Sequence, residues 1–232
     1  MKMRLQKYLA HAGLCSRRKA EEYISNGRIK VNGKTISELG SKIDPIMDSV
    51  AFDGKPVIIK QEHSKIYLAL NKPEGYVTSC SQTKTKIVMD LIDMNERVYP
   101  VGRLDKDSKG LILLTNDGDL HNKLSHPSFD HEKEYIVTTV LPVSDIALKD
   151  MAGGMSIDGI KTRKAIVKRI SSNQFRIVLK EGRNRQIRKM VQKTGNTVDT
   201  LLRIRIANIS LGNLKEGTWR YLTHAEIQKL TQ

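Results

Sequence analysis

The apolar positions of the first 60 residues change from a helical to a strand-like spacing. Between residues 3 and 12 they recur at i, i+3, i+4 and i+7, as on one face of a helix. Ser16 can cap a second helix, which is expected to stop at Asn26-Gly27. Asn32-Gly33 then separates short apolar runs, which is a strong signal for a two-residue hairpin. The pattern predicts a small helix-helix-hairpin domain over residues 1–60.

The remainder of the chain is predicted to contain many strands and few, short helices. The polar segment 60–65 makes a plausible linker, so a second domain is expected over residues 66–232. Its first apolar run, residues 66–70, reads as a buried strand, and residues 175–179 alternate clearly between two faces. The short helices are expected near residues 87–92, 120–125 and 145–151, with His126-Pro127 ending the second.

The segment 198–211 reads as one or two further strands. Its alternation places Arg203 and Arg205 on one face, opposite Ile204 and Ile206. The sequence therefore predicts that the two arginines point the same way.

The stretch from Val101 to Leu120 has the least ordinary arrangement of polar and apolar residues. Arg103 and Asp105 stand two apart, shortly before a continuous apolar run at residues 111–114. Such a run, closed by the turn-rich Asn116-Asp117-Gly118, is typical of a strand buried on both faces. The loop before it should therefore rest on a rigid support, as catalytic residues often do.

Asp105 taken alone is more often a turn residue than a catalytic group. Arg103 favours a chemical role, because a carboxylate near a guanidinium stays ionised at neutral pH, as a nucleophile or general base requires. The neighbouring Asp107, Asp117 and Asp119 are predicted to be turn and cap residues. Asp105 and Asp107 as a glycosidase acid and base have weak support, since two carboxylates two apart are common.

The charge of the chain points to a polyanionic partner. A net charge of +15 and a pI of 9.8 favour nucleic acid over a membrane surface. The charge is concentrated, because residues 161–193 hold 12 basic residues and one acidic residue, and residues 1–60 hold 12 basic residues and 6 acidic ones. Since aromatic residues make up only 5% of the chain, extended base stacking is not expected. The candidate RNA contacts are Arg4, Lys7, Arg17, Arg18, Lys19, Arg28, Lys30, Arg185 and Lys189.

Other classes of protein find little support in the sequence. Cys15 and Cys80 have no metal or redox spacing and suit a reducing compartment. His121, His126 and His131 are spaced by five, which fits neither a helical nor a strand metal face, so no metal site is expected. No apolar run approaches the length of a membrane helix, so a soluble, unexported protein is expected.

Taken together, these motifs resemble those of bacterial ribosomal RNA pseudouridine synthases that carry an N-terminal S4 domain. The resemblance covers nearly the whole chain, and residues 3 to about 50 are similar to the S4 pattern. Within the family the chain is most similar to the F type of the large-subunit synthases. The motifs that carry the resemblance are Lys72-Pro73-x-Gly75, Gly102-Arg103-Leu104-Asp105, Gly110 to Asn116, Lys133-Glu134-Tyr135 and Leu179 to Arg188.

The resemblance implies an α+β fold, with a small S4 domain followed by a catalytic domain around a mixed, largely antiparallel sheet. It also implies isomerisation of uridine to pseudouridine in ribosomal RNA, most directly 23S rRNA, without a cofactor. Ribosomal RNA is then the expected partner, and a tRNA is a candidate second one. A cytoplasmic monomer without membrane contact is expected.

Residue roles carried over by motif centre on Asp105, as nucleophile or base on a flipped-out uridine. Tyr135 would lie against the uracil, Leu179 would pack beside it, and Arg183 would pair with Asp105. Phosphate or site-ordering contacts are expected from Arg103 and Arg188.

An alternative from another class is a non-catalytic S4-type RNA-binding protein that assists ribosome assembly. A binder has no need of an ionised carboxylate beside its phosphate-binding surface. Asp105, together with Tyr135 and Arg183, is therefore the feature that discriminates between the two readings.

Overall fold

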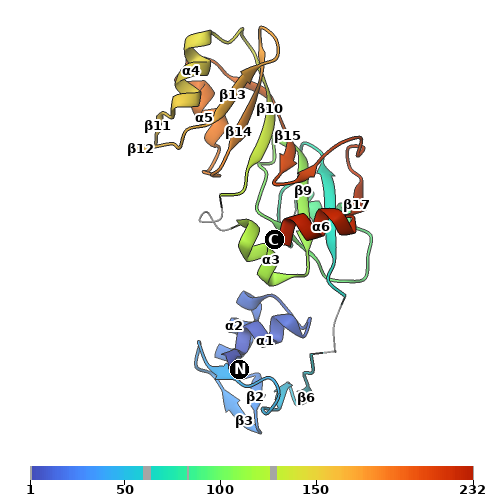
Figure 1. Ribbon diagram of the computed structural model, residues 1–232. Helices are drawn as coiled ribbons and strands as arrows, with labels where there is room; N and C mark the ends of the chain where they lie inside the picture. The colour runs from blue at the N-terminus through green and yellow to red at the C-terminus, as the bar shows by residue number, and fades with distance from the viewer. Residues whose placement is uncertain (1, 60–63, 83, 126–129, 232) are drawn as a thin grey trace. The chain divides into compact units, whose positions relative to one another are not determined.

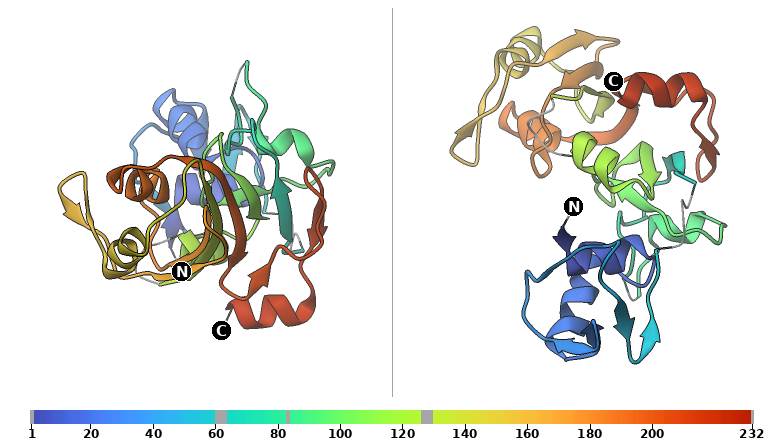
Figure 2. Two further views of the ribbon diagram at one scale, coloured as in Figure 1. Left: turned by 90° about the horizontal axis from the view of Figure 1, so that it is seen from above. Right: turned by 60° about the horizontal axis from the view of Figure 1, so that its bottom comes forward.

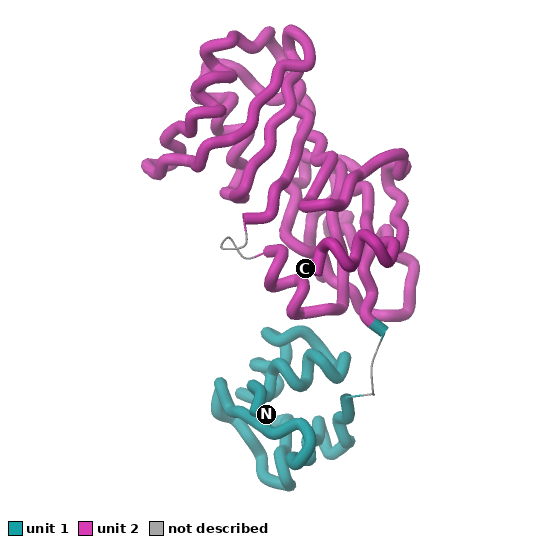
Figure 3. Tube along the Cα trace, in the orientation of Figure 1, with its two compact units in different colours: residues 1–64 teal, residues 65–232 magenta. Residues whose placement is uncertain are grey.

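The structure, a computed structural model, describes residues 2–59, 64–82, 84–125 and 130–231 (Figure 1). The chain divides into two compact units, residues 1–64 and 65–232 (Figure 3). Most of the predicted linker, residues 60–63, lies outside the described residues, and so does the predicted helix break at His126-Pro127.

The first unit contains the predicted pair of helices and hairpin. The Ser16 hydroxyl accepts a hydrogen bond from the Lys19 amide at 3.1 Å and so caps the second helix. Asn32 and Gly33 both have positive φ, 51° and 79°, as the tight turn of the hairpin requires. The elements are α1 (Leu5–His11), α2 (Arg17–Ser25), β1 (Met3–Arg4) paired with β4 (Lys42–Ile43), and a sheet of β3 (Lys34–Ile36), β2 (Ile29–Val31), β5 (Val50–Phe52) and β6 (Lys55–Pro56).

The second unit is built on one mixed sheet, which in its described part has the strand order β13-β14-β10-β15-β9-β7-β17. Neighbouring strands pair antiparallel except β9 and β15, which pair in parallel. The expected α+β fold with a largely antiparallel sheet is confirmed. The strands are β7 (Tyr67–Lys72), β8 (Tyr99–Val101), β9 (Lys109–Thr115), β10 (Lys133–Thr139), β11 (Ser156–Ile157), β12 (Ile160–Lys161), β13 (Ile166–Arg169), β14 (Gln174–Leu179), β15 (Val198–Ile206), β16 (Ile209–Ser210) and β17 (Trp219–Tyr221).

Helices cover this sheet in two separate groups (Figures 1 and 2). Side chains of α4 and α5 pack with β10 and β14 in one core, which includes Met151, Phe175 and Met190. Side chains of α3 and α6 pack with β9 in another, which includes Leu124 and Leu230. The helical elements are η1 (Val88–Leu91), α3 (Gly118–Ser125), α4 (Asp145–Gly153), α5 (Gln186–Lys193) and α6 (His224–Thr231).

Strand β9 is buried on both faces, as its continuous apolar run predicts. Leu111 and Leu113 belong to the core that includes α3 and α6, whereas Ile112 and Leu114 belong to a core on the opposite face. All four side chains are at most 2% exposed. The loop that carries Asp105 therefore enters a strand that cannot shift without disturbing two cores.

Strand β15 departs from the regular alternation that the sequence suggests. The register with β10 shifts between Glu134, which faces Arg205, and Tyr135, which faces Arg203. Ile204 is the extra residue of this bulge, so Arg203 and Arg205 point to opposite faces of the sheet. The prediction that the two arginines share a face is wrong, because a single inserted residue inverts the alternation.

Gly110 allows β9 to approach β15 at the same place. Its φ is +107°, and a Cβ there would lie 2.3 Å from the carbonyl oxygen of Arg203. An L side chain would meet both a backbone clash and an unfavourable φ. The glycine therefore fixes where Arg203 lies.

Candidate active site

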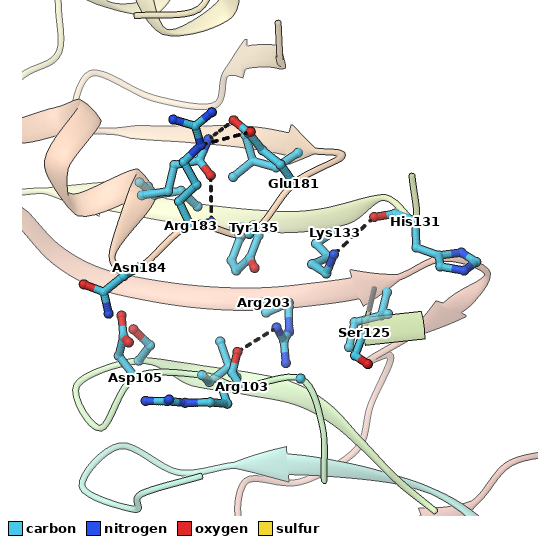
Figure 4. A pocket seen from close by; sticks show the side chains of 18 of the residues that line it. Arg103, Asp105, Ser125, His131, Lys133, Tyr135, Glu181, Arg183, Asn184 and Arg203 are labelled. Carbon is cyan, nitrogen blue, oxygen red and sulfur yellow. Dashed lines mark hydrogen bonds and ion pairs between the residues drawn. The ribbon is translucent and has the colours of Figure 1, made fainter. Parts of the chain in front are cut away.

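A cleft of about 380 Å³ opens in the second unit, between the Asp105 loop and strands β10, β14 and β15 (Figure 4). The loop from Val101 contributes one wall. Strand β10 and the turn between β14 and α5 contribute the other. The cleft brings together predicted site residues from three distant parts of the chain, namely Arg103, Asp105, Tyr135, Leu179, Arg183 and Arg185.

The loop of Asp105 is held by hydrogen bonds on both sides. The Thr78 hydroxyl donates to the Leu104 carbonyl at 2.8 Å and accepts from the Leu104 amide at 3.1 Å. The Ser108 amide donates to the Asp105 carbonyl at 3.1 Å, and the Gly75 amide donates to the Lys106 carbonyl at 2.8 Å. The backbone around the carboxylate is thus preorganised before any substrate binds.

Lys72 also holds the Asp105 loop in place. Its side chain is fully buried, and its ammonium donates to the carbonyls of Pro73 at 2.8 Å and Ser108 at 2.6 Å. Burial lowers the pKa of Lys72 to about 8. The sequence showed Lys72 only as part of a motif. A charged residue at the end of a buried strand, followed by proline, was the available signal.

Arg183 does not pair with Asp105 in this structure, contrary to the prediction. Its Nε donates to Glu181 at 3.2 Å, and its Nη atoms donate to the carbonyls of Ile160 and Lys161 at 3.2 and 3.0 Å. Figure 4 shows its guanidinium directed away from Asp105. The reason is local, because Glu181 and the carbonyl oxygens of Ile160 and Lys161 lie within reach of the Arg183 side chain.

The guanidinium beside Asp105 belongs to Arg185. Its Nη1 lies 3.8 Å from an Asp105 carboxylate oxygen, close enough for an ion pair but too far for a hydrogen bond. Arg185 has a left-handed φ of 52° and directly precedes α5. That backbone turn is invisible in the residue pattern, since arginine is not a usual residue for it.

Asp107 is more than the turn residue that the sequence predicts. Its carboxylate accepts two hydrogen bonds from Arg185, at 3.0 and 2.8 Å, and lies 3.3 Å from the Nε of Arg188. The bonds from Arg185 hold the pKa of Asp107 below its usual range. Asp117, by contrast, caps α3 as predicted, accepting from the amides of Asp119 and Leu120 at 3.0 and 3.2 Å.

Tyr135 and Leu179 contribute apolar surface to the cleft. Tyr135 is 8% exposed and stands in β10 between Ile177 of β14 and Arg203 of β15. Leu179 ends β14 directly opposite Lys133. An aromatic ring and an aliphatic side chain at one end of a cleft can hold a planar base between them.

The predicted RNA contacts lie on the surface, and several already bind an acidic side chain. Arg28 binds Asp53, and its guanidinium lies 4.7 Å from the Tyr23 ring centroid and 4.5 Å from that of Phe52. Such stacking fixes the direction of a guanidinium on the first unit. Lys19 binds Glu22 and Lys189 binds Asp158, whereas Arg4, Arg17, Arg18 and Lys30 are exposed.

The described part of the chain offers neither a metal-ion cluster nor a membrane-spanning helix. Those residues contain no group of three or more His, Cys, Asp or Glu side chains suited to a metal ion. They also contain no helix long and apolar enough to cross a membrane.

Comparison with known proteins defines the class. Residues 66–193, more than half of the chain, match the family of RNA pseudouridylate synthases, and residues 3–50 match the S4 domain. The chain belongs to the RNA pseudouridylate synthase family and is an isomerase acting on RNA. The resemblance drawn from the sequence is thereby confirmed.

Particular relatives cover nearly the whole chain. The dual-specificity RNA pseudouridine synthase RluF of Shigella flexneri is 42% identical over 225 residues, which are 97% of this chain and 77% of the relative. The ribosomal large subunit pseudouridine synthase B of Bacillus subtilis is 38% identical over 236 residues, 98% of this chain and 95% of the relative. A crystal structure of a pseudouridylate synthase superposes with a TM-score of 0.72 at 31% identity, covering 98% of this chain and 99% of that one.

Proposed function

We propose that this enzyme isomerises a uridine of 23S ribosomal RNA and that Asp105 is its catalytic carboxylate. The observation that carries the proposal is the position of Asp105 in one cleft with Tyr135, on a loop fastened from both sides. The large-subunit name of the Bacillus subtilis relative supports the choice of RNA. The dual-specificity name of the Shigella flexneri relative supports a second RNA substrate, for which a tRNA is our candidate.

Other carboxylates of the cleft are engaged elsewhere. Asp130 binds Arg163, and Glu181 binds both Arg183 and Gln186. Asp105 instead has the Arg185 guanidinium at 3.8 Å, which provides a counter-charge without occupying the carboxylate through a hydrogen bond. This leaves Asp105 available to a substrate atom.

The reaction breaks the N1–C1′ bond and forms a C5–C1′ bond, while a proton leaves C5 and another is gained at N1. No net oxidation occurs, so the proposal needs no redox cofactor. Asp105 attacks C1′ of the ribose or C6 of the uracil, and both routes detach and rotate the base. Tyr135 lies against the uracil and its hydroxyl is our candidate for moving the C5 proton, while Leu179 packs beside the ring.

Binding has to offset the extrusion of the uridine from folded RNA. Flipping a base out costs a few kcal/mol. The exposed basic residues of the first unit and Arg103 of the cleft would offset this cost through phosphate contacts, whereas Arg188, which binds Asp107, would order the site. We further propose that the enzyme acts as a monomer.

The test is a pseudouridine map of ribosomal RNA from cells that lack this protein and are complemented with variants. Asp105→Asn should restore no pseudouridine at the affected site, whereas wild type and the exposed, cleft-remote Asp93→Asn should restore it fully. RNA affinity of Asp105→Asn should stay near that of wild type. Restored modification by Asp105→Asn refutes the role of Asp105, and an unchanged 23S rRNA map in the deletion strain refutes the substrate.

A further inference from the structure

The guanidinium of Arg203 is buried in the cleft and incompletely bonded. Arg203 is 2% exposed. Its Nε donates to the Leu111 carbonyl at 2.7 Å and its Nη1 to the Arg103 carbonyl at 3.3 Å. Its Nη2 is buried without a hydrogen-bond partner among the described residues. A charged donor left in this state is unfavourable by a few kcal/mol, so the site is incomplete.

A second cation, Lys133, lies near Arg203. Lys133 and Tyr135 are two residues apart in β10 and so lie on the same face, and Tyr135 stands directly opposite Arg203. Burial, and next the charge of Arg203, lower the pKa of Lys133. Figure 4 shows both side chains in the same cleft. The Lys133 ammonium has one long hydrogen bond, 3.4 Å to the His131 carbonyl.

Acidic side chains near Lys133 and Arg203 already bind other arginines. Glu132 and Glu134, which flank Lys133, bind Arg205 on the other face of the sheet at 3.0 and 2.6 Å. Asp130 binds Arg163. Among the described ion pairs, none joins a carboxylate to Lys133 or Arg203. Two neighbouring cations, the buried Arg203 and the partly buried Lys133, thus lack a compensating charge, which an anionic ligand would provide.

We infer that Lys133 and Arg203, here named the cleft pair, form a subsite for a phosphodiester group next to the flipped uridine. The inference rests on the proposed function, since it takes an RNA strand as the substrate. Arg203 binds the carbonyl of Arg103, two residues before Asp105, so the subsite adjoins the catalytic loop. A ribose whose C1′ faces Asp105 carries its 5′ and 3′ phosphates within a few bonds.

A phosphate suits this subsite better than a uracil carbonyl does. A neutral oxygen would satisfy one donor and leave the positive charges of the buried Arg203 and the partly buried Lys133 uncompensated. A phosphate oxygen accepts from the free Nη2 of Arg203, and a second oxygen accepts from the Lys133 ammonium. The bulge at Ile204 is what turns Arg203 toward the cleft and leaves Arg205 to bind the glutamates.

The experiment compares two soluble probes on the full chain, uridine and uridine 3′,5′-bisphosphate, by calorimetry and phosphorus NMR. Wild type should bind the bisphosphate at least tenfold more tightly than uridine. Lys133→Met and Arg203→Met should each reduce that ratio at least tenfold with little effect on uridine. Uridine 5′-monophosphate and 3′-monophosphate then show which phosphate is bound.

Lys168→Met is the matched control, because Lys168 is an exposed lysine of β13 in the same sheet and outside the cleft. It should leave the ratio unchanged. Circular dichroism checks folding, and if Arg203→Met does not fold, Lys133→Met decides. The inference is overturned if wild type binds the bisphosphate no better than uridine at millimolar concentration, or if the variants weaken both probes equally.

Failure here and failure of the proposed function are distinguishable. The probe titration needs no turnover, so Asp105→Asn should show the wild-type preference for the bisphosphate. If wild type shows no preference for the bisphosphate but the deletion strain lacks a 23S rRNA pseudouridine, the subsite is refuted and the proposed function stands. If wild type prefers the bisphosphate but the deletion strain keeps all its 23S rRNA pseudouridines, only the proposed substrate is refuted.

Discussion

Two groups of cations lie next to the Asp105 loop and differ in what they bind. In the first, here named the rim cluster, Arg185 and Arg188 share the carboxylate of Asp107, and the group is partly exposed. In the second, the cleft pair of Lys133 and Arg203, the described partners are backbone carbonyls. The rim cluster has one carboxylate, that of Asp107, for its two guanidiniums, whereas no carboxylate binds the cleft pair among the described ion pairs.

This difference distinguishes charged side chains that fix the geometry of the site from charged side chains that are available to bind a substrate. A paired and solvated charge adds little net energy, but it fixes geometry, such as the position of Arg185 beside Asp105. A buried charge without a counter-charge destabilises the free enzyme and is relieved by an anion. The rim cluster should therefore govern the shape of the loop, and the cleft pair should govern affinity for the substrate.

The largest effect is expected from Gly110→Ala, which displaces the strand that carries Arg203. The new Cβ would lie 2.3 Å from the Arg203 carbonyl oxygen, at a φ of +107°. We expect a loss of about 3 kcal/mol or more in the free energy of unfolding. Urea denaturation measures it. Gly153→Ala, whose Cβ meets no atom within 4 Å, is the control and should change stability little.

A loss as small for Gly110→Ala as for Gly153→Ala would contradict the close approach. Binding of uridine 3′,5′-bisphosphate by any folded Gly110→Ala protein should also weaken, because Arg203 moves. A destabilised protein that keeps the full preference for the bisphosphate would show that the contact between β9 and β15 does not position the cleft pair.

The sequence was sufficient for elements that rest on local patterns. The Asn32-Gly33 turn, the Ser16 cap and the doubly buried β9 follow from residue type and spacing, and each is found. The carboxylate at Asp105 and the ring at Tyr135 also lie in one cleft. Resemblance in sequence brought them together, because no spacing rule connects residues 30 positions apart.

The sequence was insufficient where one backbone irregularity decides the direction of a side chain. The bulge at Ile204 separates Arg203 from Arg205, and strict alternation cannot reveal it. The left-handed turn at Arg185 places that residue, and not Arg183, beside Asp105. Lys72 reads as a surface lysine until the strand that carries it is seen to be buried.

A smaller effect is expected from Lys72→Met, which measures what a buried cation costs when its partners are carbonyls. The pKa of Lys72 is lowered from its ordinary value of 10.5 to about 8 in the folded protein. Between these two pH values the unfolded chain therefore binds more protons than the folded one. Wild-type stability should therefore rise with pH across that window, by about 2 kcal/mol from this residue.

The measurement is urea denaturation of both proteins at the lower and upper ends of that window. The free energy of unfolding should rise more between these pH values in wild type than in Lys72→Met, because methionine has no proton to lose. Lys168→Met, at an exposed site, should rise as wild type does. An equal rise in wild type and Lys72→Met would show that Lys72 does not titrate in this range.

The smallest effect is expected from Asp107→Asn, which opens the rim cluster. The pKa of Asp107 is lowered in the folded state, chiefly by its bonds from Arg185. Its contribution is therefore present above the ordinary aspartate pKa and is lost as pH falls through the lowered value. The carboxylate is 40% exposed, so the loss at neutral pH should stay below about 1 kcal/mol. Urea denaturation should show the stabilities of the two proteins converging as the pH falls below the ordinary aspartate pKa. Asp93→Asn serves as the control, and a gap that persists in acid would mean that Asp107 acts through packing and not through its charge.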